Sequence, residues 1–129
     1  MIVLDASVVV TALGSDGPDG DRTRARLRDE VLVAPHLVDI EVVSAWRRLV
    51  ATGQLTDRRV DIAIADLATL GLRRIPHPPL LDRCWELRHD LTPYDATYVA
   101  LAERLGSALL TFDARLAAAP GTRCEIEVL

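Results

Sequence analysis

The feature that most constrains the fold of this chain is a regular alternation between short apolar runs and longer amphipathic stretches. Nearly continuous apolar strands that are separated by helices are typical of a parallel sheet covered on both faces. We therefore expect the α/β class, as a three-layer α/β/α sandwich around a mostly parallel sheet of four to five strands. The apolar runs that predict strands cover residues 2–4, 31–34, 72–75, 108–112 and 124–129.

Helix signals fill most of the intervals between these runs. Pro35 is expected to open one helix at its first position, Thr56 to cap the next, and Gly106 to end the last long one. A segment rich in Gly, Asp, Ser and Pro, residues 14–20, predicts a loop. The expected helices cover residues 5–13, 22–30, 35–51, 56–70, 80–89, 92–106 and 113–118.

Length and composition favour one packed domain over residues 1–129. Half of the residues are hydrophobic but only 4% are aromatic, so aliphatic side chains must form the core. No apolar stretch approaches the roughly 20 residues of a membrane span. The first residues carry no basic segment before the apolar one, which argues against a secretory signal peptide. We expect a cytoplasmic protein without a membrane partner. Two cysteines, Cys84 and Cys124, lack C-x-x-C spacing and are expected to be reduced and structural.

Acidic residues follow two of the predicted strands. The sequence Ile-Val-Leu-Asp5 ends the first strand, and Leu-Leu-Thr-Phe-Asp113 ends the fourth. Because ligands gather outside the carboxyl ends of parallel strands, we expect Asp5 and Asp113 on one rim of the sheet. Asp95 opens the helix before the fourth strand and is expected at the same rim.

Glu41 lies about two turns into the helix that follows the second strand. At 100° per residue its neighbours on the helix surface are Leu37 and Ala45, at the edge of the apolar stripe. A carboxylate at such an edge faces a cleft more easily than open water. The stripe itself is expected to contain Val38, Val42, Ala45 and Leu49.

Each of these acids also has a purely structural interpretation. Asp5 and Asp113 precede helices and would serve as N-caps, and Thr92-Pro93-Tyr94-Asp95 fits a capping box. Glu41 would be an ordinary boundary residue. As a set, however, four converging carboxylates would repel one another and raise each other's pKa values unless a cation lay among them. Hard oxygen ligands favour Mg²⁺ or Mn²⁺.

Other polar and aromatic residues are not assigned to this site. His36, His77 and His89 lack the clustering of zinc ligands. Asp39 falls beside Trp46 on the helical wheel, which suggests a role at the helix start or in a buried polar contact. Trp46 and Trp85 are expected in the core or an interface rather than in nucleic-acid binding.

Four blocks, in order along essentially the whole chain, resemble the PIN-domain nucleases and, among them, the VapC-type toxins of type II toxin–antitoxin pairs. The blocks are Met-Ile-Val-Leu-Asp5-Ala-Ser7, Pro35 with Glu41 and Arg47-Arg48, Tyr94-Asp95-Ala96 leading to Glu103, and Leu-Thr111-Phe-Asp113. One departure is Ser44, where the family often has Asn. This difference is expected to affect a supporting hydrogen bond more than the activity.

The resemblance implies a function and a site. Asp5, Glu41, Asp95 and Asp113 would hold one or two Mg²⁺ or Mn²⁺ ions, and the Ser7 and Thr111 hydroxyls would orient a carboxylate, a water or the substrate. The reaction would be endonucleolytic hydrolysis of RNA by a metal-activated water, leaving a 5′ phosphate on the downstream product.

The resemblance also implies partners. These are a second copy in a homodimer and a small VapB-type antitoxin that often projects an Arg into the acidic site. The helical spacing of Val60, Ile64 and Leu67 fits such an interface and ordinary core packing equally well. The alternating arginines 22, 24, 26 and 28 would spread over more than one helix face, as a solvated surface or as phosphate contacts.

Charge and motif arguments leave alternatives for the function. The net charge of −4 argues against a diffuse nucleic-acid surface, although two divalent ions among the acids would offset it. A housekeeping RNA-processing nuclease of the same fold and a non-catalytic binding module remain alternatives. A phosphatase with Asp5 as nucleophile would need a second acid two residues later, where the chain has Ser7.

Overall fold

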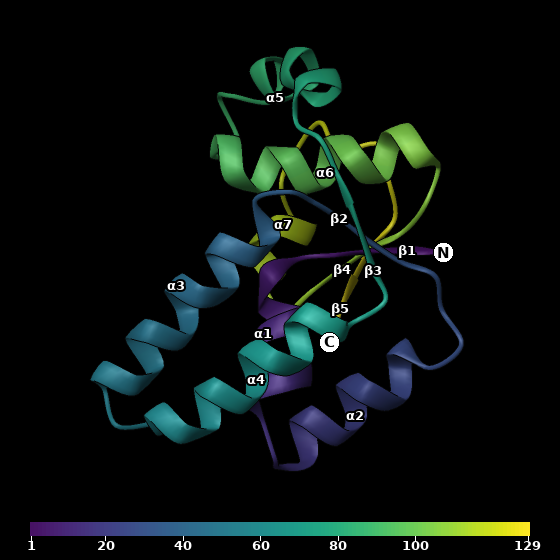
Figure 1. The fold of residues 1–129 in the computed structure, drawn as a ribbon. Coiled ribbons are helices and arrows are strands. Elements are labelled where there is room, and N and C mark those ends of the chain that lie inside the picture. Colours follow the sequence, from purple (N-terminus) through teal and green to yellow (C-terminus); the bar gives the residue numbers. More distant parts are fainter.

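Five parallel strands form the centre of the protein in the order β3-β2-β1-β4-β5, as the computed structural model of residues 1–129 shows (Figure 1). Val3 pairs with Val33 on one side and with Leu109 on the other, so β1 lies in the middle of the sheet. The expected three-layer α/β class is confirmed, and all five strands are parallel. The strands are β1 (Ile2–Leu4), β2 (Leu32–Pro35), β3 (Leu72–Ile75), β4 (Leu109–Thr111) and β5 (Ile126–Val128).

Helices cover the two faces of this sheet. In Figure 1, α5 and α6 lie on one side of the strands, and α1, α2 and α4 lie on the other, where α3 packs against α1 and α4. The longer helices are α1 (Ala6–Gly14), α2 (Pro18–Leu27), α3 (Val38–Ala51), α4 (Asp57–Thr69) and α6 (Pro93–Leu105). The short ones are the 3₁₀ turn η1 (Pro78–Leu80), α5 (Leu81–Glu86) and α7 (Ala114–Ala117).

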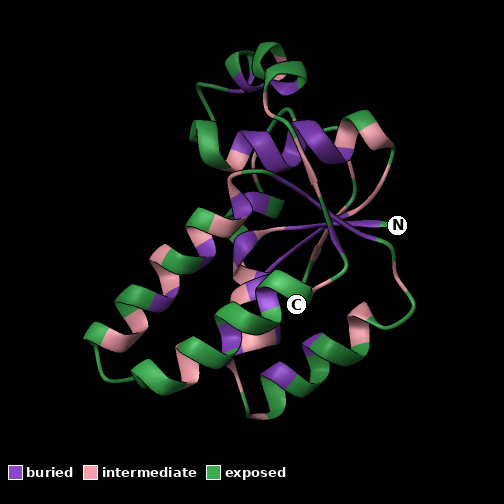
Figure 2. Cartoon of the chain, viewed as in Figure 1, coloured by how far each residue is buried: buried purple, intermediate pink, exposed green.

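The core is aliphatic and centred on β1, β2, β4 and α6. Every residue of these three strands is buried, as is every residue of α6 from Ala96 to Ala102 (Figure 2). A helix that is buried on all sides needs a second layer over its outer face, and α5 provides that layer. Gly106, at a φ of 60°, ends α6 in the left-handed conformation that glycine adopts without strain.

The direction in which successive strands are added to the sheet reverses between β1 and β4. From β1 the chain proceeds outward through β2 and β3, and then returns to place β4 on the opposite side of β1. In parallel α/β sheets ligands bind in the crevice at this switch point, outside the carboxyl ends of the strands. Asp5 directly follows β1 and Asp113 comes two residues after β4, so both acids lie at this crevice.

Two predictions for the N-terminal half of the chain, the extent of a loop and the start of a helix, were wrong. The predicted loop over residues 14–20 is only Ser15–Gly17, because α1 continues to Gly14 and Pro18 begins α2 at its first position. Pro35 does not open a helix but ends β2, paired with Ile75. The strand pairing continues into His36, whose N–H donates to the Ile75 carbonyl, so α3 begins only at Val38.

Other boundaries moved for local reasons. The helix predicted over residues 22–30 runs from Pro18 to Leu27, and Asp29 beyond it has a positive φ of 65°. The helix predicted over residues 80–89 is shorter, with η1 leading into α5. The last two strands, β4 and β5, are each shorter than the predicted runs.

The structure contains no helix with both the length and the apolar character needed to cross a membrane.

Candidate active site

An open cleft of about 490 Å³ lies at the switch point between β1 and β4. Three of the four predicted acids, Asp5, Glu41 and Asp113, line it, together with Ser7 and Arg48. Its apolar wall comes from α1 and α3, with Ala6, Val10, Ala45 and Leu49, and Thr11 of α1 also lines it. The cleft therefore combines carboxylates from three separate parts of the chain with one exposed arginine.

Asp5 is held by two hydroxyl groups. Ser7 Oγ and Thr111 Oγ1 both donate to Asp5 Oδ2, at 2.5 Å and 2.8 Å. The hydroxyls accept in turn from backbone N–H groups, Ser7 from Phe112 at 3.1 Å and Thr111 from Asp113 at 3.0 Å. Asp5 occupies the N-cap position of α1, but its side chain makes no capping hydrogen bond. Its other oxygen, Oδ1, accepts no hydrogen bond from the protein.

Glu41 is paired with a buried tyrosine that the sequence analysis missed. The hydroxyl of Tyr98, on α6, donates to Glu41 Oε2 at 2.5 Å. Burial raises the pKa of Glu41, and the charges of Asp5 and Asp95 add to the increase, whereas the Tyr98 bond and Arg48 oppose it. Burial, followed by the bond to Glu41, also raises the pKa of Tyr98 far above its ordinary value. Tyr98 thus remains a hydrogen-bond donor over the whole physiological pH range.

Asp95 is half-buried at the start of α6, just outside the residues that line the cleft. Thr92 caps the helix by accepting the Asp95 N–H at 3.2 Å, which confirms the forward half of the predicted capping box. Burial raises the pKa of the Asp95 carboxyl, and the charge of Asp5 adds to the increase. Its carboxylate is therefore electrostatically part of the acidic group.

Asp113 both caps a helix and lines the cleft. Its Oδ1 accepts the Arg115 N–H at 2.9 Å, so it is the N-cap of α7. The Arg115 guanidinium also lies 3.2 Å from each carboxylate oxygen, and these hydrogen bonds hold the pKa of Asp113 below its usual range. Arg115, with 92% of its side chain exposed, is thus a cation paired with one of the four acids.

The four acids are linked electrostatically and differ in how they are held. In the structure as it stands, no group of three or more His, Cys, Asp or Glu side chains is arranged to hold a metal ion. The donor set consists of carboxylate and hydroxyl oxygens, which suit hard cations. Burial, with the charge of Asp5 in addition, raises the pKa values of both Glu41 and Asp95, so added positive charge would be stabilising here.

The residues left undecided by sequence have structural roles. Asp39 accepts two hydrogen bonds from Arg74 on β3, both at 2.8 Å, which confirms that it belongs to a polar contact. Trp46 is fully buried in the core. Ala45, which was expected in the buried stripe of α3, instead faces the cleft. Trp85 is 68% exposed, beneath the Arg88 guanidinium.

The arginines of α2 mostly bind within the protein. Arg24 donates to the Ala12 and Ser15 carbonyls, and Arg26 pairs with Glu127 and Glu30. Arg22 pairs with Asp19, and Arg28 is exposed without a partner.

Three apolar positions of α4, Val60, Ile64 and Leu67, differ in burial. Leu67 is buried, Val60 is partly buried against the core, and Ile64 is exposed. The two cysteines are free.

Two site residues carried a weak signal in the sequence. Tyr98 is the one polar aromatic within the apolar run 96–102, and a buried tyrosine hydroxyl almost always finds a partner. Arg115 follows Asp113 by two residues, a distance at which its side chain can return to the cap carboxylate.

Comparison with known proteins identifies the family of this chain. The PIN domain family model matches residues 2–121. Ribonuclease VapC1 of Mycobacterium tuberculosis is 44% identical over 98% of this chain and 96% of its own length. Ribonuclease VapC9 of the same species is 41% identical over 100% of this chain and 98% of its own. The crystal structure of PAE2754 from Pyrobaculum aerophilum superposes with a TM-score of 0.71 at 25% identity, over 98% of this chain and 83% of that one. The chain belongs to the PIN-domain family, in its group of VapC ribonucleases.

Proposed function

We propose that this protein is an endoribonuclease that acts as the toxin of a type II toxin–antitoxin pair and that depends on Mg²⁺ or Mn²⁺. The observation that carries the proposal is the anchoring of Asp5. Its carboxylate is fixed by Ser7 and Thr111 at the strand switch point, with Glu41, Asp95 and Asp113 around it. The relationship to ribonucleases VapC1 and VapC9 over nearly the whole chain supports RNA as the substrate.

Asp5, Glu41, Asp95 and Asp113 would hold the ions, one or two in number. Divalent cations in such a site supply an activated water and neutralise charge on the scissile phosphodiester. The donor chemistry fits because all four groups are carboxylates and no histidine or cysteine lines the cleft. The fit is also electrostatic, since burial and then the charges of neighbouring acids raise the pKa values of Glu41 and Asp95, and a cation would favour their ionised forms.

The protein's own residues prepare the site for this chemistry. Ser7 and Thr111 occupy one oxygen of Asp5 and so direct the other, Oδ1, toward an incoming ligand. Tyr98 fixes Glu41 and favours its ionised form. Arg48 lines the cleft and Arg115 is exposed at its edge, where both guanidinium groups can contact RNA phosphates.

The same cleft suits an inhibitory partner. An antitoxin arginine would place a guanidinium among carboxylates that lack a strong counterion, and bidentate pairing with Asp5 or Glu41 would neutralise them. Arg115 already makes such a pair with Asp113, which shows that the rim accepts a guanidinium. We propose a VapB-type antitoxin as this partner and a homodimer as the toxin's own assembly. A housekeeping nuclease of the same fold would lack an antitoxin gene directly upstream.

The proposal is tested by cleavage of total RNA in the presence of Mg²⁺, Mn²⁺ or EDTA. We expect cleavage with either metal, none with EDTA, and 5′-phosphate ends on the downstream products. Asp5→Asn and Asp95→Asn should abolish cleavage, whereas Asp66→Asn, which removes an exposed carboxylate on α4, should not. Undiminished cleavage by both site variants would refute the assignment.

A further inference from the structure

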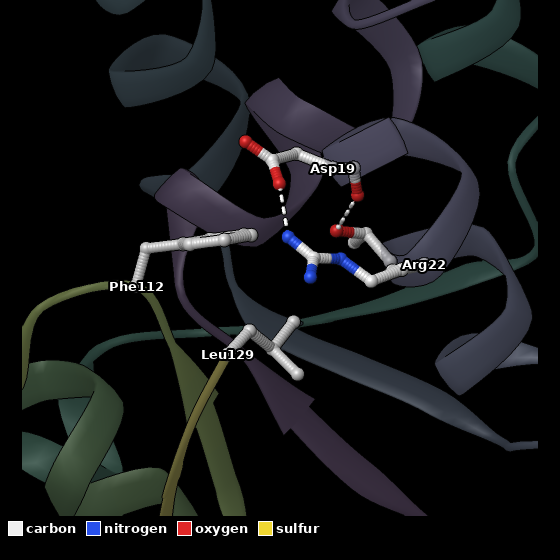
Figure 3. Close-up of a pocket in the computed structure, with 5 residues that line it drawn as sticks. Asp19, Arg22, Phe112 and Leu129 are labelled. Carbon is white, nitrogen blue, oxygen red and sulfur yellow. Dashed lines mark hydrogen bonds and ion pairs between the residues drawn. The ribbon is translucent and has the colours of Figure 1, made fainter. Parts of the chain in front are cut away.

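A second, smaller cavity lies beside the acidic cleft and has no role in the function described so far. It has a volume of about 210 Å³ and is formed between α2 and the ends of β4 and β5. Figure 3 shows Asp19 and Arg22 of α2 facing Phe112 and Leu129 across it, and Thr23 completes the lining. Phe112 is the residue directly before Asp113, so the cavity adjoins the acidic site along the chain.

The side of the cavity next to the sheet is fixed by the same hydrogen bonds that hold the carboxylates. The Phe112 N–H donates to Ser7 Oγ, the hydroxyl that binds Asp5. The Leu129 N–H donates to the Thr111 carbonyl at 2.9 Å. The backbone position of Phe112 is therefore coupled to the positions of Asp5 and Thr111.

The α2 side of the cavity is fixed as well. Arg26 donates to both carboxylate oxygens of Glu127 on β5, at 2.9 Å and 2.8 Å. Gly20 packs so closely on the turn before α2 that an added Cβ would lie 2.1 Å from the Ser15 carbonyl oxygen. These contacts fix the α2 backbone opposite Phe112, so the cavity is formed without a ligand, and the exposed Asp19 and Arg22 side chains project from that helix.

The lining of the cavity matches a nucleobase better than a phosphate. Phe112 and Leu129 offer an aromatic and an aliphatic surface. Arg22 is paired with Asp19, so the pair offers donors and an acceptor without net charge. The Thr23 hydroxyl is already used on the Asp19 carbonyl at 2.7 Å. A phosphate needs unpaired positive charge, whereas an unstacked base has a π-face for stacking and an edge with both donors and acceptors.

We propose that this cavity is a subsite that holds one unstacked base of single-stranded RNA, beside the phosphodiester that is cut. The volume, below the about 300–1,000 Å³ typical of drug-sized ligands, is enough for one base only. Phe112 provides the stacking surface, and the Asp19–Arg22 pair reads the edge of the base. The inference rests on the proposed ribonuclease function and makes this subsite a source of sequence preference.

The test uses a single-stranded RNA pool of random sequence, cleaved in Mn²⁺ and sequenced at the new ends. The enzymes are the wild type, Phe112→Leu, Phe112→Trp, Arg22→Gln and Arg28→Gln, each checked for folding by thermal unfolding. Phe112→Leu keeps an apolar side chain but removes the π-face, whereas Phe112→Trp keeps a π-face. Arg28→Gln is the matched control, because it removes an exposed, unpaired arginine close to the same helix.

We expect the wild type to prefer one base at a single position next to the cut. Stacking is worth about 1–3 kcal/mol per base, so Phe112→Leu should reduce that preference by a factor of about 5 to 150, with other positions unchanged. Phe112→Trp should retain a preference at that position, Arg22→Gln should change which base is preferred, and Arg28→Gln should behave as the wild type.

Three results would overturn the inference. A wild-type enzyme that leaves the pool intact refutes the proposed function and this subsite with it. Cleavage by Phe112→Leu with an unchanged preference refutes the subsite alone. A wild-type enzyme that cuts the pool without any base preference next to the cut also refutes the subsite alone.

Discussion

Removal of the Tyr98 hydroxyl is the most informative single perturbation of the site. Tyr98→Phe keeps the buried ring in the core and deletes only the group that donates to Glu41 Oε2. Hydrogen bonds to charged groups contribute about 1.5–3 kcal/mol, against about 0.5–1.5 kcal/mol for neutral pairs. Because Glu41 is only half-buried, water can replace part of the lost bond. We therefore expect a destabilisation near 1.5 kcal/mol at neutral pH, at the lower end of the range for a charged partner.

The size of this effect should depend on pH. The pKa of folded Glu41 is raised above its unfolded value by burial, so the folded state keeps its proton to higher pH. This carboxyl therefore lowers stability as the pH rises from its unfolded pKa through its folded pKa. The Tyr98 bond reduces that loss because it favours the charged form. At low pH, removal of the Tyr98 hydroxyl should therefore reduce the free energy of unfolding by little more than a neutral hydrogen bond contributes. At neutral pH the reduction should reach its full value.

The assay is urea unfolding of metal-free wild type and Tyr98→Phe at several pH values from about 4 to 8. Tyr94→Phe is the matched control, because Tyr94 lies on the same helix, is 63% exposed and makes no side-chain hydrogen bond. A second measurement is the pH dependence of RNA cleavage, whose acidic limb should move to higher pH in Tyr98→Phe. An equal loss of stability at all pH values, or none at all, would refute the coupling of Tyr98 to ionised Glu41.

The remaining predictions concern stability and metal affinity. Asp95→Asn should raise the melting temperature of the metal-free protein, because burial and like charges disfavour its carboxylate; a fall would contradict this. Asp113→Ala should cost about 1 kcal/mol in urea unfolding through loss of the α7 cap. Trp46→Ala should cost about 3–5 kcal/mol as a fully buried residue, whereas Trp85→Ala should change stability by less than about 0.5 kcal/mol. Arg115→Ala should tighten Mn²⁺ binding in calorimetry without RNA, since it removes the cation paired with Asp113; unchanged affinity would show that the pair is unimportant.

The sequence was most informative where a residue's position follows from strand order. Asp5 and Asp113 end two strands, and the rule for parallel sheets was sufficient to place them on one rim. Their helix-capping roles could not be separated by sequence, because both residues precede a helix. Only the hydrogen bonds show that Asp113 caps α7 while Asp5 instead accepts from Ser7 and Thr111.

Tertiary contacts explain what the sequence did not predict. Pro35 has a strong tendency to begin helices, but its pairing with Ile75 keeps it in β2. Tyr98 acquires its role from Glu41, which is 57 residues away along the chain. Trp46 replaces Ala45 in the buried stripe of α3 because the core, and not the ideal helical wheel, decides which side of the stripe is covered.

The central claim is that four carboxylates from separate parts of the chain form one cation site. It is tested most directly by titrating Mn²⁺ into the RNA-free protein and measuring free Mn²⁺ by electron paramagnetic resonance. We predict saturable binding of one or two ions that is lost in Asp5→Asn and retained in Asp66→Asn. Absence of saturable binding, or equal binding by wild type and Asp5→Asn, would contradict the account.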